Sequence, residues 1–132
     1  MNYMLDTDTC IALIRQQLPI LFQKVISFQP GEIGLSTITV AELQYGVERS
    51  QYRERNEAAL TQFLLPFEIA DFDSTSALTY GRVRAELEAC GTPIGALDTL
   101  IAAQALTLKV NLVTNNLREF RRVKGLDLEN WL

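Results

Sequence analysis

Short apolar segments alternate along the chain with longer segments of helical spacing, and this alternation restricts the fold more than any other feature. An apolar run of about four to eight residues is typical of a buried strand, whereas apolar residues three and four apart indicate a helix. The expected strands cover residues 2–5, 33–35, 67–70, 110–113 and 126–128. Strands joined by helices form a parallel sheet that is covered on both faces. We therefore predict an α/β fold, a three-layer sandwich with a short, mainly parallel sheet of four or five strands flanked by helices.

The helical segments are bounded by proline and glycine, which end helices. A helix over residues 74–90 is expected to carry Leu78, Val83 and Leu87 inward. The segment 97–108 is apolar on most sides, so we expect a buried helix there. Further helices are expected over residues 10–14, 21–26, 37–47, 53–65 and 117–122.

The chain has 132 residues, of which 48% are hydrophobic, so we expect a single domain over residues 1–132 with a sizeable core. No apolar run approaches the roughly 20 residues of a membrane helix, and no secretory signal pattern is present. We therefore expect a cytoplasmic protein that does not bind membranes. Cys10 and Cys90 lie in apolar surroundings without a C-x-x-C pattern, and we expect both to be reduced, buried and inert.

The sequence contains no histidine, which excludes histidine triads, histidine-ligated zinc and histidine general bases. The net charge of −4 argues against a nonspecific nucleic-acid binder. That argument loses force where acidic residues surround divalent cations, because the ions reverse the local field. Basic residues also cluster in one short segment. This cluster, a candidate for phosphate contacts, consists of Arg118, Arg121, Arg122 and Lys124.

Several acidic and amide residues could each be an ordinary helix cap or part of a site. Asp6 stands at the start of a helix, where aspartate is a good cap. Glu42 ends a T-x-x-E pattern, and Asn116 and Glu119 form N-x-x-E, both typical of capped helices. Asp98 lies in the first turn of the apolar helix, where a negative charge suits the helix dipole.

The positions of these residues favour a shared site. Asp6, Asp98 and Asn116 are each expected at or just beyond the end of a strand that leads into a helix, and Glu42 one turn into such a helix. In an open parallel sheet these places meet in the crevice outside the carboxyl ends of the strands. Carboxylates gathered there repel one another unless a cation joins them, and Mg²⁺ or Mn²⁺ suits oxygen ligands. Such a site indicates phosphodiester hydrolysis, which needs no histidine.

Four segments together, in order and over nearly the whole chain, resemble VapC-type toxins of the PIN-domain family. They read YMLDTDTCIALIR, LSTITVAELQYGVERSQ, GTPIGALDTLIAAQAL and LVTNNLREFRRVKGLDLENW. The resemblance implies a PIN-like fold and a Mg²⁺- or Mn²⁺-dependent endoribonuclease, the toxin of a type II toxin–antitoxin pair. It also implies a homodimer that is silenced by a VapB-type antitoxin. The segment TNNLREFRRVKGL is similar to toxins that act on tRNA, particularly initiator tRNA near the anticodon.

The family's acidic residues carry over to Asp6, Glu42 and Asp98, which the resemblance implies are metal ligands and water activators. The fourth family position is often aspartate but is Asn116 here, followed one helical turn later by Glu119. Asparagine cannot neutralise a second ion, so a strong second metal site requires Glu119.

Two further features of the motif segments are open at this point. Asp8 stands where the family commonly has asparagine, and it could be a harmless substitution or add charge at the mouth of the site. Four hydroxyl residues could either hold the carboxylates or act as ordinary caps. They are Thr7, Ser36, Thr37 and Thr114.

Two alternatives compete with the ribonuclease hypothesis. The residues Asp6-Thr7-Asp8-Thr9 match the D-x-D-x-T signature of haloacid-dehalogenase-like phosphatases, with Asp6 as nucleophile and Asp8 as general acid. The late acidic pair of that family is missing. The other alternative is a non-catalytic PIN-like module that only binds a partner. Metal-dependent cleavage of RNA would distinguish the ribonuclease from the phosphatase and from the binding module.

Overall fold

Five strands form one sheet in the computed structural model of the protein, which describes residues 1–16 and 18–132. The strands are β1 (Tyr3–Leu5), β2 (Ile33–Ser36), β3 (Glu68–Ala70), β4 (Asn111–Val113) and β5 (Leu128–Glu129). Their order is β3-β2-β1-β4-β5, and every neighbouring pair is parallel. The predicted α/β fold with a short parallel sheet is therefore confirmed, including the fifth strand at the edge.

The helices within the described residues follow the expected order. They are α1 (Thr7–Ile14), α2 (Pro19–Ile26), α3 (Thr37–Glu48), α4 (Arg53–Leu64), α5 (Ser74–Ala89), α6 (Ala96–Leu108) and α7 (Leu117–Phe120). None of them combines the length and apolar character that a membrane crossing requires.

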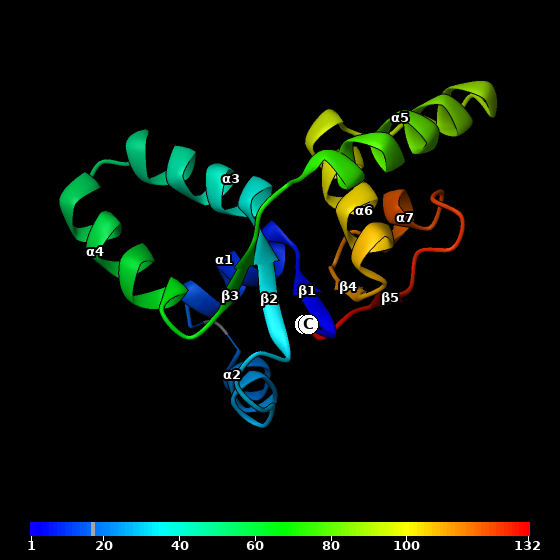
Figure 1. Cartoon of the computed structure of the whole chain (residues 1–132). Helices are drawn as coiled ribbons and strands as arrows, with labels where there is room; N and C mark the ends of the chain where they lie inside the picture. The colour runs from blue at the N-terminus through cyan, green and yellow to red at the C-terminus, as the bar shows by residue number, and fades with distance from the viewer. Residues whose placement is uncertain (17) are drawn as a thin grey trace.

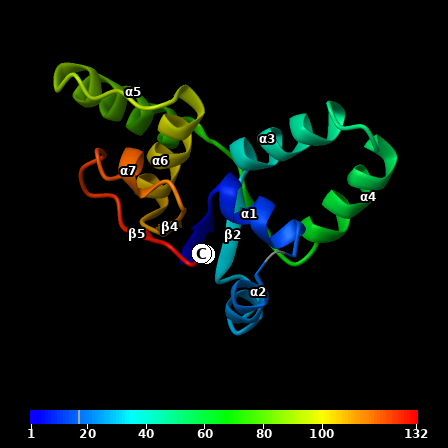
Figure 2. The same ribbon diagram turned by 180° about the vertical axis from the view of Figure 1, so that it is seen from behind.

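Helices cover both faces of the sheet, with α1 to α4 on one side and α5 to α7 on the other (Figure 1; Figure 2 gives the view from behind). Because side chains alternate along a strand, neighbouring residues enter different cores. Leu5 and Val113 pack with α1 to α4, whereas Met4 and Leu112 pack with α5 to α7. Both cores thus use the same two central strands, which explains why Met4, Leu5, Leu112 and Val113 are all apolar.

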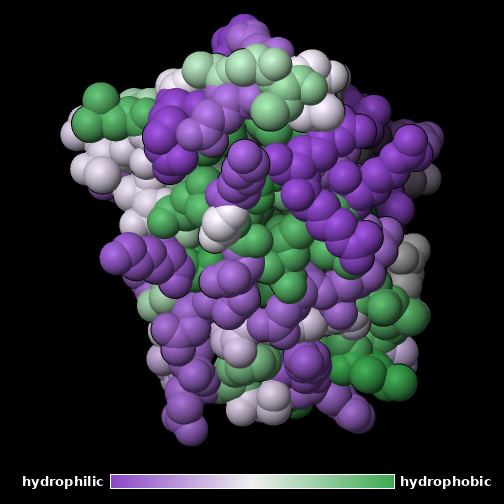
Figure 3. Space-filling model, turned by 90° about the vertical axis from the view of Figure 1, so that its right-hand side faces the viewer, coloured by the Kyte–Doolittle hydropathy of each residue, from purple (hydrophilic) through white to green (hydrophobic). Residues whose placement is uncertain are grey.

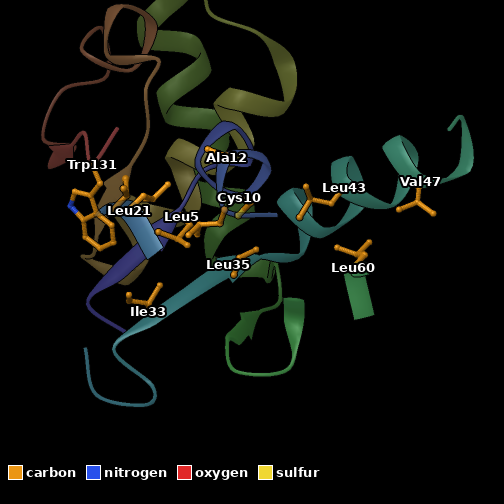
Figure 4. Packing of buried hydrophobic residues seen from close by; sticks show 12 residues of the cluster. Leu5, Cys10, Ala12, Leu21, Ile33, Leu35, Leu43, Val47, Leu60 and Trp131 are labelled. Carbon is orange, nitrogen blue, oxygen red and sulfur yellow. The ribbon is translucent and has the colours of Figure 1, made fainter. Parts of the chain in front are cut away.

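The core on the α1 to α4 side also fixes the end of the chain (Figure 4). Trp131 stacks on Phe28, with ring centroids 5.3 Å apart, and lies 5.3 Å from the ring of Tyr3 on β1. Lys24 places its ammonium group 5.0 Å from the centre of the Trp131 ring. These contacts join the C-terminal segment to α2 and β1.

Two expectations about single residues in or beside α5 are wrong. Leu78 is 79% exposed, although Val83 and Leu87 are buried as expected. Ser76 is the buried residue of that turn, and Leu78, two positions later, points about 200° away around the helix. Cys90 is exposed because it lies at the end of α5, beyond the last residue that packs on the core, whereas Cys10 is buried as expected.

The strand order reverses at β1, which predicts a crevice outside the carboxyl ends of β1 and β4. From β1 the chain builds outward to β2 and β3, and it then crosses to β4 on the other side of β1. Ligands of open α/β sheets bind at such a point, outside the carboxyl ends of the strands. Helix α6 runs back to the start of β4, so its first turn lies at that same edge.

We predict that Gly34→Ala destabilises the protein. A Cβ atom at Gly34 would lie 2.6 Å from the main-chain oxygen of Glu68 on the neighbouring strand and would also overlap the Met1 side chain. The backbone cannot yield without disturbing the β2–β3 pair, and overpacking of this kind costs about 1–3 kcal/mol. Urea unfolding measures the change.

Gly81→Ala is the matched control, because a Cβ at Gly81 on exposed α5 meets nothing within 4 Å. That substitution should stabilise the helix by roughly 0.5–1 kcal/mol. Equal stability of the two variants would contradict the prediction.

Candidate active site

Asp6 follows β1 and is buried, with 5% of its surface exposed. It occupies the cap position of α1, yet its side chain makes no capping hydrogen bond. Instead Oδ2 accepts a hydrogen bond of 2.7 Å from the hydroxyl of Thr114, which follows β4. Burial raises the pKa of the Asp6 carboxyl from 3.8 to about 6, the Thr114 bond opposes that rise, and the charges of Asp8 and Glu42 add to it. The helix-cap interpretation of Asp6 is therefore wrong.

Glu42 lies in α3, beyond the first turn, and also takes no part in a cap. The cap of α3 is Ser36, whose hydroxyl accepts from the main-chain N–H of Ile38 at 2.9 Å. Oε1 of Glu42 accepts a hydrogen bond of 2.7 Å from the Thr7 hydroxyl at the start of α1. This bond ties the helix after β2 to the helix after β1.

Asp98 does not follow a strand, so that part of the expectation is wrong. It lies in the first turn of α6, which comes after α5 and a short turn. It still reaches the expected edge of the sheet, because α6 runs back towards the start of β4. Burial first, then a hydrogen bond to Glu119 and the charges of Asp6, Glu119 and Glu42, raise the pKa of Asp98 to about 7.

Glu119 on α7 is the partner of Asp98. Hydrogen bonds from the Asp98 carboxyl and from the amide of Asn116 lower the pKa of Glu119. Nδ2 of Asn116 donates to Oε2 of Glu119 at 3.0 Å, and the side chain of Asn116 does not cap α7. The main-chain N–H of Asn116 donates to the Thr114 hydroxyl at 2.9 Å. A chain of hydrogen bonds thus connects Asp6, through Thr114 and Asn116, to Glu119 and Asp98.

The four hydroxyl residues divide between the two roles that the sequence left open. Thr7 and Thr114 hold carboxylates. Ser36 caps α3, and the hydroxyl of Thr37 accepts from the main-chain N–H of Phe72 at 3.2 Å. The residues that hold carboxylates are those whose helix or loop starts beside β1 or β4, the two strands that border the crevice.

Asp8 has contacts that the sequence did not reveal. Oδ1 accepts from the main-chain N–H of Thr9 at 2.6 Å, and Oδ2 accepts from the main-chain N–H of Asn115 at 3.0 Å. Asn115 is 107 positions away in the sequence, so no local pattern indicates this bond. Both oxygens are engaged with main-chain donors, which does not suit the general acid that the phosphatase alternative needs.

The basic cluster lies on and just after α7, the helix that carries Glu119, and its four side chains are exposed. Arg122 has a structural contact as well, since Nη1 donates to the main-chain oxygen of Pro93 at 2.9 Å. Its charge also contributes to lowering the pKa of Glu119. Figure 3 shows the face that lies on the right-hand side of Figure 1, where hydrophilic residues surround a hydrophobic area.

The donor set of the crevice fits a hard divalent cation. Its carboxylate and amide oxygens are of the kind that such an ion prefers. The pKa values of Asp6 and Asp98 are raised, and a bound cation would lower them again. The side-chain conformations do not form a complete set of ligands: among residues 1–16 and 18–132, no three acidic or cysteine side chains are arranged to hold one ion. Asp98 is engaged by Glu119, and Glu42 by Thr7.

Comparison with known proteins identifies the family. The family model described as PIN domain matches residues 3–126. The chain belongs to the PIN-domain family. It is 42% identical over 132 residues to ribonuclease VapC2 of Rickettsia felis, covering 99% of this chain and 98% of that protein. It is 40% identical over 131 residues to the tRNA(fMet)-specific endonuclease VapC of Salmonella typhimurium, with the same coverage of 99% and 98%.

Solved structures agree with this PIN-domain assignment and place the chain among VapC-type proteins. The crystal structure of VapBC2 from Rickettsia felis, bound to a DNA fragment from its promoter, contains a chain that matches with a TM-score of 0.95 and 41% identity over the full length of both chains. DNA-bound VapBC from Salmonella typhimurium matches with a TM-score of 0.95 and 39% identity, covering 100% of this chain and 99% of that one. The haloacid-dehalogenase alternative is therefore discarded.

We predict that Asp6→Asn stabilises the protein in EDTA at pH 7.5. The folded state raises the Asp6 pKa from 3.8 to about 6, so it binds more protons than the unfolded chain between these values. The free energy of unfolding therefore falls as pH rises through this window and stays lower above it. Asparagine removes this loss of up to roughly 3 kcal/mol and can still accept from Thr114.

Thermal unfolding at pH 7.5 and pH 4 measures the effect, which should shrink at the lower pH. Asp73→Asn is the control, because Asp73 is an exposed cap of α5 and asparagine caps a helix about as well. A lower Tm for Asp6→Asn than for the unsubstituted protein at pH 7.5 would show that burial of the charge is not costly.

Proposed function

We propose that the protein is the toxin of a type II toxin–antitoxin pair and cleaves RNA as a Mg²⁺- or Mn²⁺-dependent endoribonuclease. The observation that supports this most is the gathering of four carboxylates at the reversal point of the sheet, where the charges of Asp6, Glu42 and Glu119 all raise the pKa of Asp98. The names of the PIN-domain relatives, ribonuclease VapC2 and tRNA(fMet)-specific endonuclease VapC, point to the same activity.

In this proposal Asp6, Glu42 and Asp98 hold the metal ion, and Glu119 supplies the fourth carboxylate. Thr114 fixes one oxygen of Asp6, and Thr7 fixes one oxygen of Glu42. Asp98 joins them by rotating its side chain from Glu119 towards Asp6, whose charge already contributes to the raised pKa of Asp98. Asn116 then serves to orient Glu119 rather than to bind a second ion, since its amide donates to that carboxylate.

Hydrolysis adds a water oxygen to phosphorus, breaks the bond to the leaving ribose oxygen and delivers a proton to that oxygen. A bound Mg²⁺ or Mn²⁺ would activate the water and stabilise the charge on the phosphate. The protein holds the carboxylates in place through hydroxyl and amide donors, which avoids reorganisation during the reaction. This division of work requires no histidine, and the sequence has none.

For the substrate we propose tRNA, with initiator tRNA near the anticodon as the specific target. Two relatives named tRNA(fMet)-specific endonuclease, about 40% identical over nearly the whole chain, support this target. The basic cluster can contact phosphates beside the cleaved bond, because α7 carries Glu119 as well as Arg118. Arg122 contributes less to RNA, since it already donates to Pro93.

For the partner we propose a VapB-type antitoxin that covers an apolar groove. The groove has a volume of about 1090 Å³ and lies between α1, α2 and α4 beneath the start of β2. Its wall includes Phe22 and Ile26, which are 57% and 62% exposed. Large exposed apolar surfaces mark interaction sites, and the similar chains of known structure occur in VapBC complexes.

We also propose a homodimer, which the resemblance to VapC-type toxins implies. Three aromatic residues are candidates for contacts with the second copy or with the antitoxin. Tyr45 on α3 and Tyr52 just before α4 are 67% and 61% exposed, so both are available as contacts. Phe63 packs partly on the core and therefore has a structural role as well.

We predict that the purified protein cuts a total tRNA pool into discrete fragments with Mg²⁺ or Mn²⁺ and that EDTA stops cleavage. Asp6→Asn and Asp98→Asn should lose activity by at least about 100-fold, and Glu119→Gln by about 10–100-fold, because a residue that orients or completes a metal site contributes on that scale. Gel analysis of end-labelled tRNA measures the rates.

Asp73→Asn should cleave like the unsubstituted protein, because Asp73 is an exposed residue whose carboxylate caps α5. Intact RNA in both metals, with folded protein free of antitoxin, would favour the non-catalytic binding module. Full activity in Glu119→Gln would remove Glu119 from the site without affecting the other three residues.

We predict that Phe22→Glu weakens binding of the cognate VapB-type antitoxin at least tenfold, since it places a charge in the apolar groove. Leu108→Glu is the control, because Leu108 is 42% exposed at the far end of α6 and does not line the groove. Titration calorimetry with purified antitoxin measures both. Unchanged affinity for a folded Phe22→Glu protein would place the antitoxin elsewhere.

A further inference from the structure

We propose that Asp8 is a positioning residue, whose carboxylate holds the loop between β4 and α7 so that Thr114 and Asn116 orient the carboxylates of the site. The expected effect on RNA cleavage rests on the proposed function. The positioning role itself rests on hydrogen bonds, because Asp8 joins the first turn of α1 to a loop 107 positions later.

The two oxygens of Asp8 serve two different main-chain donors. Oδ1 accepts from the N–H of Thr9 within α1, at 2.6 Å. Oδ2 accepts from the N–H of Asn115 in the loop, at 3.0 Å. The Thr9 hydroxyl lies 3.2 Å from Oδ1 and 3.3 Å from the main-chain oxygen of Val113, the last residue of β4, and its single proton is shared between these two acceptors. The first turn of α1 therefore forms hydrogen bonds with both the end of β4 and the loop that follows it.

The two main-chain donors distinguish aspartate from asparagine at this position. A carboxylate presents an acceptor to each N–H group. An asparagine has one acceptor oxygen, and its NH₂ group would face the second N–H donor. Only aspartate satisfies both main-chain groups at once.

The loop that Asp8 holds contains the donors to the site. Thr114 precedes Asn115 and donates its hydroxyl to Asp6 at 2.7 Å. Asn116 follows Asn115 and donates its amide to Glu119 at 3.0 Å. Since these two residues flank Asn115 directly, a shift of the Asn115 main chain moves both contacts. Asp8 thereby acts on Asp6 and on Glu119 through one anchored peptide, beside the direct effect of its charge on the Asp6 pKa. The exchange of the Asn115 amide separates the two effects.

The experiment compares Asp8→Asn and Asp8→Ala with Asp73→Ala, which removes an exposed carboxylate that accepts from Ser76 and caps α5. Amide exchange of Asn115 followed by NMR, the Kd for Mn²⁺ measured by titration calorimetry without RNA, and tRNA cleavage are measured below the Tm of every variant. We expect Asp8→Ala to lose protection of Asn115 and to weaken both Mn²⁺ binding and cleavage by about 10–100-fold, with Asp8→Asn between it and the unsubstituted protein.

Asp73→Ala should lower the Tm and leave the Kd for Mn²⁺ unchanged. An Asp8 variant that behaves in the same way, with reduced Tm and unchanged Mn²⁺ affinity, overturns the proposal. If Asp8→Ala does not fold, the Mn²⁺ affinity of Asp8→Asn decides. If the unsubstituted protein binds Mn²⁺ but cleaves no RNA, the proposed function fails, whereas Asn115 exchange and Mn²⁺ affinity still test the role of Asp8.

Discussion

Burial of the Asp6 carboxylate between β1 and β4 is the constraint on which the rest of the crevice depends. A nearly inaccessible carboxylate is unfavourable unless hydrogen bonds or a counter-charge compensate for lost hydration. The Thr114 hydroxyl supplies one bond, and Thr114 is itself held by the loop that Asp8 anchors. The carboxylates of Asp8 and Glu42 oppose this stabilisation, because both raise the Asp6 pKa further. The local arrangement is therefore poor for stability, as expected at a functional site.

The same logic distinguishes these residues from helix caps. A capping side chain accepts a hydrogen bond from the first turn of its own helix, as Asp73 does for α5. Asp6 and Asn116 occupy cap positions but direct their side chains to Thr114 and Glu119. Residues of the right type at a cap position thus need not act as caps when a second strand end lies beside them. The parallel sheet provides that second strand end.

Local signals explain how much of the molecule could be predicted from its sequence. Apolar runs and helical spacing located the strands and helices, and strand ends brought Asp6 and Asn116 to one crevice. Asp98 reached the crevice by a different route, from the first turn of a helix that runs back along the sheet. Contacts between distant segments were not predictable, and the Asp8–Asn115 bond is the clearest case. The prediction that Leu78 is buried was also wrong, because helical spacing alone does not show which face of α5 meets α6.

The acidic balance of the chain fits the proposed chemistry once the charges are placed on the structure. Acidic side chains gather at the end of β1, on α3, at the start of α6 and on α7, where a divalent cation would reverse the field. The basic cluster begins on α7, one residue from Glu119. A polyanion would thus meet positive side chains beside the Glu119 carboxylate on a single short helix. Net charge averages over these two regions, so it describes neither of the surfaces that RNA would approach.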